Sequence, residues 1–246
     1  MRKRLTLLAL AVVLASGLCL AAPPDTNSPT KEAVQAHLDR AKVNQHGSVQ
    51  ASLNGGVVTL TGTVDELKAK QDAEKAAWKT PGVTWVVNNI QVHAEEVTDQ
   101  SLVRQVYHEL VMYYAYGIFD YVNPQVENGT LVVNGYVTQP FKKTDLGRIF
   151  AQVKGVKAVQ NNLEVLPPSS FDDRLRMQLA RAIYGSPYFT PYANLAVPPI
   201  HIVVKNMHVT LEGVVNSKID KVNAGMAANR TGLSFSVVNN LRVVKG

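Results

Sequence analysis

The chain has 246 residues, with 25 Lys and Arg against 19 Asp and Glu, so its formal net charge is +6. Three of the cations, Arg2, Lys3 and Arg4, precede an apolar run from Leu5 to Leu20, which is the pattern of a secretory signal peptide; we place it at residues 1–21. Its removal leaves 22 cations (25 minus 3) against 19 anions, or +3, and so small an excess gives no basis for nucleic acid as a partner.

The only cysteine, Cys19, lies within this segment, so the mature chain has no disulfide. Acylation of Cys19 is the alternative to cleavage, but it is less favoured because the bulky Leu18 stands where a small residue is wanted. No later segment is long and apolar enough to span a bilayer. We therefore expect an exported chain without a transmembrane span.

The rest of the chain contains one sequence pattern three times. Leu53–Val64 reads LNGGVVTLTGTV, Val126–Val137 reads VENGTLVVNGYV, and Val204–Val215 reads VKNMHVTLEGVV. A glycine in each is followed 26 residues later by an Asn pair, from Gly62 to Asn88, from Gly135 to Asn161 and from Gly213 to Asn239, although the copies are 73 and 78 residues apart. Such fixed spacing predicts three copies of one structural unit.

In chain order, each unit is expected to begin with a helix, over 31–42, 99–114 and 172–184. A hairpin follows, turning at Asn54, Asn128 and Asn206, and then a second helix and a final strand of the VVNNIQV kind. The fold class is thus α+β: three tandem α-β-β-α-β units, each a small mixed three-stranded sheet with two helices on one face. Their predicted bounds are 28–95, 98–166 and 170–246, with linkers too short to separate the units.

The second helix of each unit shows an apolar face. The predicted buried positions are Leu146, Ile149, Phe150 and Val153 in the second copy, Ala69, Ala73, Ala76 and Ala77 in the first, and Ile219, Val222 and Met226 in the third. Asp65 is the predicted N-cap of the first of these helices. The first Asn of each pair is interpreted as architecture, with a side-chain amide that satisfies local backbone groups.

This element order, the hairpin text V-x-N-G-x-V-x-L-x-G-x-V and the closing G-V-x-x-V-x-N-x-L-x-V resemble the BON domain family. Gly62, Gly135 and Gly213 match its strand glycine. The third copy departs from the pattern, with Met207 in the hairpin turn and an insertion between Gly185 and Pro199. The resemblance implies a non-enzymatic periplasmic or envelope protein that associates with phospholipid or with envelope proteins.

The residues themselves indicate no catalytic, cofactor or metal site. The six histidines show no close ligand spacing, and the mature chain has no cysteine nucleophile. His201 and His208 flank the third hairpin and could meet across it, but they are interpreted as polar strand residues. No cofactor is expected.

Aromatic residues are distributed unevenly, since all 17 follow Glu74. Two windows between a first helix and its hairpin hold nine of them: Tyr113, Tyr114, Tyr116, Phe119 and Tyr121, then Tyr184, Tyr188, Phe189 and Tyr192. Rings with polar tips suit both membrane interfaces and protein contacts. Two interpretations remain open: the rings seal joints between units, or they form a binding surface.

Two functions follow from the second interpretation. In the first, the windows contact anionic phospholipid and the protein supports envelope integrity or osmotic-stress tolerance; the candidate residues are Tyr113, Tyr114, Tyr116, Phe119, Tyr121, Tyr188, Phe189 and Tyr192. In the second, the protein is a chaperone-like scaffold that binds other exported proteins. The sequence leaves the oligomeric state open.

Overall fold

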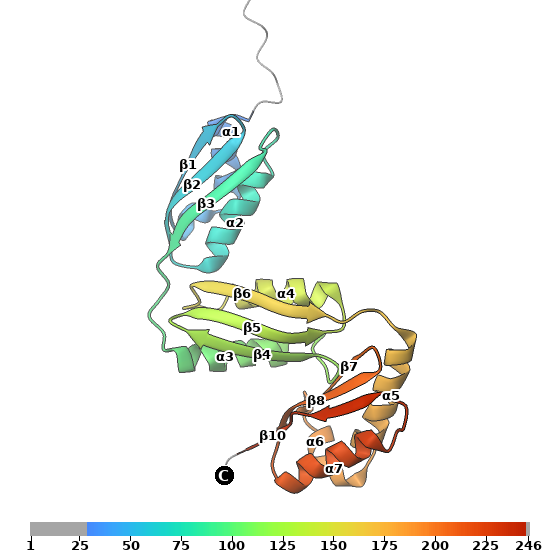
Figure 1. The fold of residues 1–246 in the computed structure, drawn as a ribbon. Helices are drawn as coiled ribbons and strands as arrows, with labels where there is room; N and C mark the ends of the chain where they lie inside the picture. The colour runs from blue at the N-terminus through green and yellow to red at the C-terminus, as the bar shows by residue number, and fades with distance from the viewer. Residues whose placement is uncertain (1–28, 245–246) are drawn as a thin grey trace, which may run out of the picture.

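A computed structural model describes residues 29–244, and it contains three successive units of the predicted kind (Figure 1). The expected signal peptide at 1–21, with Cys19, lies outside the described residues. Unit 1 consists of α1 (Lys31–Arg40), a 3-10 turn η1 (Val43–Gln45), β1 (Gly47–Asn54), β2 (Val57–Val64), α2 (Leu67–Trp78) and β3 (Trp85–Val92). Its sheet has the order β1-β2-β3, with β1 antiparallel and β3 parallel to β2.

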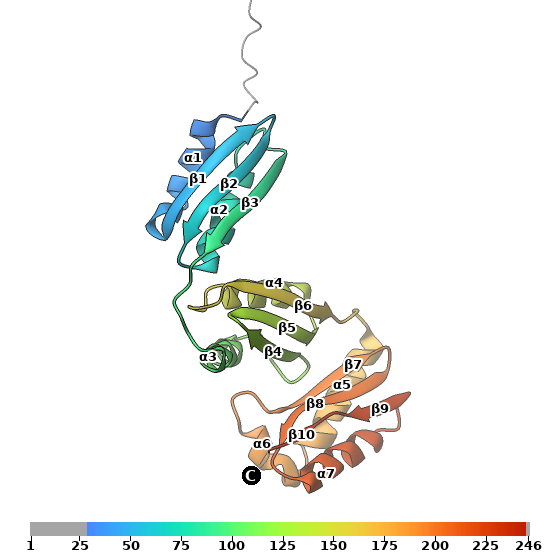
Figure 2. The same ribbon diagram turned by 60° about the vertical axis from the view of Figure 1, so that its left-hand side comes forward.

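Unit 2 repeats this arrangement with α3 (Asp99–Met112), β4 (Tyr121–Glu127), β5 (Thr130–Val137), α4 (Pro140–Phe150) and β6 (Ala158–Val165). Unit 3 has α5 (Ser170–Tyr184), η2 (Pro187–Phe189), α6 (Thr190–Ala193), β7 (Ile200–Lys205), β8 (His208–Val215) and α7 (Lys218–Asn229). Its last strand is interrupted, so β9 (Ser236–Asn239) and β10 (Arg242–Val243) pair with successive parts of β8 (Figure 2). The predicted α+β fold of three mixed sheets is confirmed.

The first Asn of each pair fixes the last strand against the second helix. The side-chain amides of Asn88, Asn161 and Asn239 donate to the carbonyls of Lys70, Lys143 and Lys221 over 2.9, 2.8 and 2.7 Å. Each side-chain oxygen also accepts from the backbone amide two residues further on. The interpretation of these residues as architecture is confirmed, and the shared bond identifies equivalent positions in α2, α4 and α7.

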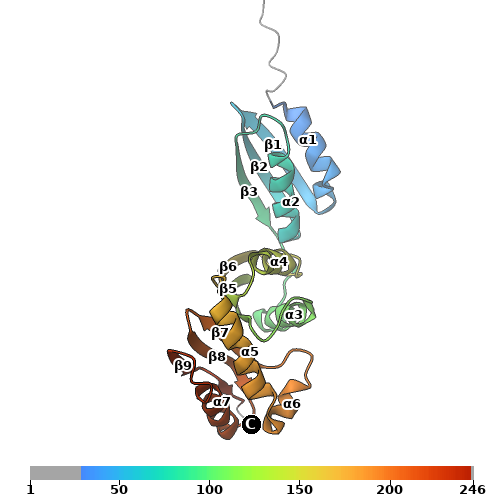
Figure 3. The same ribbon diagram turned by 90° about the vertical axis from the view of Figure 1, so that its right-hand side faces the viewer.

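Both long helices of a unit pack on one face of its sheet, as Figure 3 shows for units 1 and 2. The second helix buries Ala73 and Ala77 in α2, Leu146 and Phe150 in α4, and Ala224 and Ala228 in α7. These are equivalent positions, so the buried face keeps one register through all three units. Among residues 29–244, no helix combines the length and apolar character needed to cross a bilayer.

Two local predictions are wrong. Ile219, Val222 and Met226 are 66, 57 and 50% exposed and form the outer face of α7, because the bond from Asn239 to Lys221 turns the alanines toward the sheet. Asp65 does not cap α2, whose N-cap is Glu66 without a side-chain hydrogen bond. The carboxylate of Asp65 instead lies 3.1 Å from the imidazole Nδ1 of His46.

Candidate functional site

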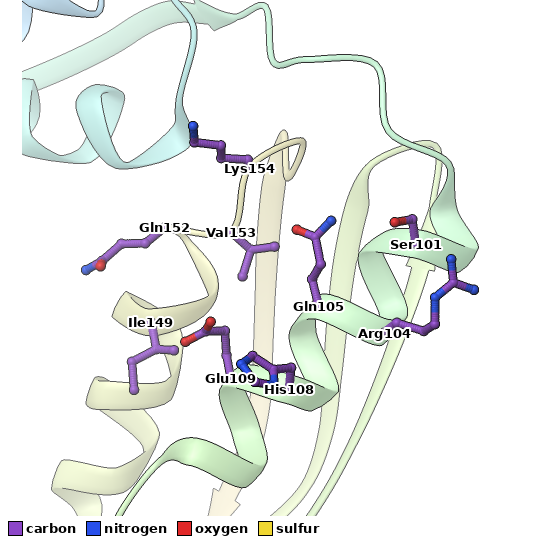
Figure 4. Close-up of a pocket in the computed structure, with 9 residues that line it drawn as sticks. All are labelled: Ser101, Arg104, Gln105, His108, Glu109, Ile149, Gln152, Val153 and Lys154. Atoms are coloured by element: carbon purple, nitrogen blue, oxygen red, sulfur yellow. The ribbon is translucent and has the colours of Figure 1, made fainter.

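A groove of about 540 Å³ lies between α3 and α4 of unit 2. Ser101, Gln105 and His108 line it from α3, and Ile149 and Gln152 from α4 (Figure 4). The two cations at its rim do not converge: the Arg104 side chain extends away from α4, and Lys154 lies at the other end of the groove (Figure 4). Among residues 29–244, no group of three or more His, Cys, Asp or Glu is placed to hold a metal ion.

The structure divides the first aromatic window. Tyr113 is 7% exposed and its hydroxyl donates to Asp145 of α4 over 2.9 Å. Its neighbour Tyr114 is 86% exposed and stacks edge-on against the Tyr113 ring. Met112 precedes them at 69% exposure. Only Tyr114 of this pair therefore presents its ring to solvent.

Three further residues of the first window form a joint between units 2 and 3. Tyr116 and Tyr121 lie on His201 of β7, with ring centroids 5.4 and 5.8 Å from the imidazole, and Phe119 packs against the unit 3 core. The backbone amide of Ile202 donates to the carbonyl of Ile118 over 2.7 Å. The interpretation of the rings as a seal between units thus applies to Tyr116, Phe119 and Tyr121.

His201 is the member of this joint that the sequence did not reveal. It is 7% exposed, and its Nε2 lies 3.4 Å from the Tyr116 hydroxyl. Burial lowers the pKa of His201, and the adjacent backbone of Asp120 and Gly117 opposes this only in part. His208 is exposed and bonds to Ser236 over 2.7 Å, so the two histidines do not meet.

A buried ion pair holds the joint loop in place. Asp120 is 1% exposed and accepts from Lys142 Nζ at 2.7 Å, from the Thr138 amide at 2.8 Å and from the Gly117 amide at 3.2 Å. A buried carboxylate needs such a complete set of donors to remain charged. The loop that carries Tyr116 and Phe119 is therefore anchored to the start of α4.

The second window folds back within unit 3. Phe189 and Tyr192 are 2 and 6% exposed, whereas Tyr188 is 46% exposed. The hydroxyls of Tyr188 and Tyr192 both donate to Asp220 of α7, over 2.6 and 2.7 Å. Desolvation alone would raise the pKa of Asp220, but the hydrogen bonds from Tyr188, Tyr192 and Ser217 outweigh it and lower the pKa. Tyr184, also in this window, bonds to the backbone of Ile200.

The outer face of α7 is an exposed apolar helix face. Ile219, Val222 and Met226 follow the i, i+3, i+7 spacing of a single stripe, which we call the α7 surface. The equivalent positions are Lys68, Gln71 and Lys75 in unit 1 and Phe141, Thr144 and Arg148 in unit 2. The stripe is thus specific to unit 3.

Comparison with known proteins agrees with this architecture. The model of the BON domain matches residues 26–94, 119–167 and 172–245, so the chain belongs to the BON domain family. An uncharacterized protein in the gshII 5' region of Anaplasma centrale is 32% identical over 124 residues, which cover 47% of this chain and 82% of that protein.

Among solved structures, one similar chain is CdsD, a structural protein of the type III secretion system of Chlamydia trachomatis. The two are 14% identical with a TM-score of 0.26, and the match covers 87% of this chain and 93% of the CdsD chain. A second structure, of the C-terminal domain of CdsD, gives the same identity and TM-score over 87% of this chain and 96% of its own. These values are too low to support a functional argument.

Family membership suggests a role in the cell envelope with phospholipid as a ligand, and BON domain proteins are generally non-enzymatic. Features that differ between the units are then candidates for the specific role of each unit. The α7 surface and the exposed part of the first aromatic window are two such features.

Proposed function

We propose that the protein is a non-enzymatic, exported envelope protein that binds anionic phospholipid mainly through the α7 surface and supports envelope integrity or osmotic-stress tolerance. The observation that carries the proposal is the exposed stripe of Ile219, Val222 and Met226 on a helix that unit 1 and unit 2 keep polar or basic at most of these positions. A stripe of this kind suits a helix that lies in the plane of a membrane surface.

The charges on α7 support an anionic lipid over a neutral one. Lys218 and Lys221 flank the stripe, and neither takes part in an ion pair among the described residues. The one carboxylate of the helix, Asp220, is occupied by the two tyrosine hydroxyls. The helix therefore offers uncompensated positive charge beside its apolar side chains, which favours an anionic surface by roughly 1 kcal/mol per cation.

Tyr114 is the proposed second contact. Two more apolar side chains of unit 2 are exposed, Met112 at the end of α3 and Phe141, which is 47% exposed, at the start of α4. Phe141 occupies the position equivalent to Ile219, so units 2 and 3 expose an apolar residue at the same place. Tyr113, Phe189 and Tyr192 are buried and contribute by holding the surrounding elements rather than by reaching lipid.

Vesicle flotation tests the proposal. The chain without residues 1–21 is mixed with phosphatidylglycerol-containing vesicles and with pure phosphatidylcholine vesicles. We expect flotation with the anionic vesicles, weaker at high salt, because screening reduces the attraction of Lys218 and Lys221. Absence of flotation with either composition would refute lipid binding.

A matched pair of variants locates the site. Replacing Ile219, Val222 and Met226 by serine is expected to lower the vesicle affinity by about 100-fold, since three half-exposed side chains lose roughly 1 kcal/mol of burial each. The control variant has serine in place of Met177 and Leu195, which are 48 and 52% exposed elsewhere in unit 3. It should bind as the wild type does. Equal losses in both variants would place the lipid contact elsewhere.

Binding of other exported proteins is a second candidate function. The exposed apolar side chains Phe171, Leu233 and Phe235 at one end of unit 3 favour it.

A further inference from the structure

One end of unit 3 has acquired large apolar side chains at positions that units 1 and 2 keep small or polar. A shared backbone hydrogen bond shows which positions of the three units are equivalent. In every unit the carbonyl of the second residue of the hairpin turn accepts from a backbone amide just before the last strand. The bonds run from Thr84 N to Gly56 O, from Lys157 N to Gly129 O and from Phe235 N to Met207 O, each over 2.9 Å. Two residues before these donors stand Gly82, Gly155 and Leu233. Where unit 2 has Gly129 and Lys157, unit 3 therefore has Met207 and Phe235, and Leu233 is an added residue after Gly232, which keeps the left-handed backbone of Gly155.

The first helix adds a fourth position. The Asp99 carboxylate accepts from the amides of the unit 2 turn, at 2.8 and 3.0 Å, and the Asp172 carboxylate does so in unit 3, at 2.9 and 2.8 Å. The residue before this aspartate is Thr98 in unit 2 and Phe171 in unit 3. The four apolar residues Phe171, Met207, Leu233 and Phe235 lie at the hairpin end of unit 3, which we call the unit 3 tip.

The backbone at Met207 indicates that its side chain is kept despite a conformational cost. Met207 has φ +63°, in the left-handed region, and the equivalent Gly56 and Gly129 have φ +84° and +77°. Glycine adopts this region freely, whereas an unbranched side chain such as that of Met is strained there. The Met207 side chain also packs against the unit 3 core, so its core contact offsets part of the cost of this backbone conformation.

The tip is open to solvent. Phe171, Leu233 and Phe235 are 63, 49 and 77% exposed. A hollow of about 220 Å³, large enough for one aliphatic side chain, is lined by Phe171, Arg174, Leu175, Gln178, Met207 and Leu233. The guanidinium of Arg174 lies 4.8 Å from the centre of the Phe171 ring and supplies a cation at the rim.

Unit 2 shows what fills the equivalent place. The extended linker before α3 carries Val97, whose side chain packs so closely on Gly155 and Leu102 that a Cβ on Gly155 would lie 2.9 Å from Val97 Cγ2 and 3.0 Å from Leu102 Cδ2. Leu102 is the equivalent of Leu175, one wall of the hollow, and the counterpart of Gly155 is Gly232, which directly precedes the second wall, Leu233. Two carboxylates, Glu95 and Glu96, precede Val97. No linker residue lines the hollow of unit 3.

We propose that the unit 3 tip binds an extended peptide segment of another exported protein, with an aliphatic side chain in the hollow, as Val97 of the linker lies on unit 2, and with preceding acidic residues attracted by the Arg174 cation at the rim. The partner is defined by this chemistry, acidic and then aliphatic in an extended backbone. The site is separate from the α7 surface, so it stands or falls independently of lipid binding.

A synthetic peptide of residues 93–98, HAEEVT, is the probe. Amide chemical shifts of the ¹⁵N-labelled chain without residues 1–21 are followed as the peptide is added. We expect saturable shifts at Met207, Leu233 and Phe235, and a loss of roughly tenfold in affinity when the valine of the peptide is replaced by serine. No saturable shift at the tip with millimolar peptide, or equal affinity of the serine peptide, would overturn the proposal.

The variant Met207→Gly separates binding from folding. It restores the residue of units 1 and 2, so relief of the strained turn offsets the lost packing of Met207 on the unit 3 core and the melting temperature should change little, while the affinity for the peptide should fall by about tenfold. The double variant F171S/L233S should lose peptide binding but float with anionic vesicles as before. Unchanged peptide affinity in Met207→Gly would refute the role of the tip, and loss of vesicle flotation in F171S/L233S would assign the tip to lipid instead.

Discussion

Acidification should loosen the joint between units 2 and 3 through His201. The imidazole is buried between Tyr116 and Tyr121, and burial lowers its pKa below the ordinary value of 6.5. The closed joint therefore holds His201 neutral, while the opened joint releases a histidine of ordinary pKa. The stability of the joint is fully present above about pH 6.5 and is lost as the pH falls through the lowered pKa.

The loss of joint stability at low pH is limited by one proton, which His201 binds in the open form and not in the closed form. Each pH unit below 6.5 removes at most about 1.4 kcal/mol, so about 1.4 kcal/mol is the upper limit for the weakening of the joint between pH 7.5 and 5.5. The groups that face the ring or its tyrosine neighbours are the Asp120 carboxylate near His201 and the Glu212 and Arg242 side chains near Tyr121. Asp120 partly offsets the loss, because it favours the imidazolium.

Hydrogen exchange of the Ile202 amide measures this opening directly, because that amide donates to Ile118 across the joint. Relative to the variant His201→Leu, which cannot titrate, the protection of Ile202 in the wild type should fall by about fivefold between pH 7.5 and 5.5. The variant supplies the control for acid titration elsewhere in the chain. A pH dependence of protection that is identical in wild type and variant would refute the role of His201.

Three further predictions concern unit 2 and are read by far-UV circular dichroism in urea, with the fluorescence of Trp78 and Trp85, both in unit 1, as an internal control. Asp120→Ala strands Lys142 in a part-buried site and should destabilise unit 2 by about 3–5 kcal/mol; a loss below 1 kcal/mol contradicts the buried ion pair. Gly135→Ala should lower stability by about 3 kcal/mol or more, because its Cβ would lie 2.0 Å from the Tyr121 carbonyl oxygen at φ +133°, and a neutral outcome would show that the strand relaxes. Asn161→Ala removes the bond to the Lys143 carbonyl and should cost about 1–3 kcal/mol, whereas Asn162→Ala, at an exposed position, should have little effect.

Much of the fold could be predicted from the sequence because the repeated residues act on the backbone close to them. A turn that needs positive φ selects Asn and Gly, and a strand that crosses close to a neighbouring carbonyl selects Gly135. The Asn amide that bridges the last strand and the second helix needs a fixed separation from that glycine, which is why a spacing of 26 residues persists.

The sequence did not show which face of α7 packs on the sheet. The helix has two apolar stripes, the alanines and the Ile219–Met226 stripe, and hydrophobic periodicity favours the larger side chains. The bond from the Asn239 amide to the Lys221 carbonyl fixes the rotation of the helix, and in that rotation Ala224 and Ala228 face the sheet. The sequence could have revealed this only through comparison with Ala73 and Ala77 of unit 1.

The aromatic windows show the same division. The sequence by itself determined that they are inserted in one slot of units 2 and 3, since composition and spacing are properties of the chain. Only the tertiary structure decided that Tyr116 and Tyr121 close on His201, that Tyr188 and Tyr192 bind Asp220, and that Tyr114 stays exposed. The physical reason is that burial depends on contacts between residues as far as 85 positions apart, such as Tyr116 and His201, and no local pattern records them.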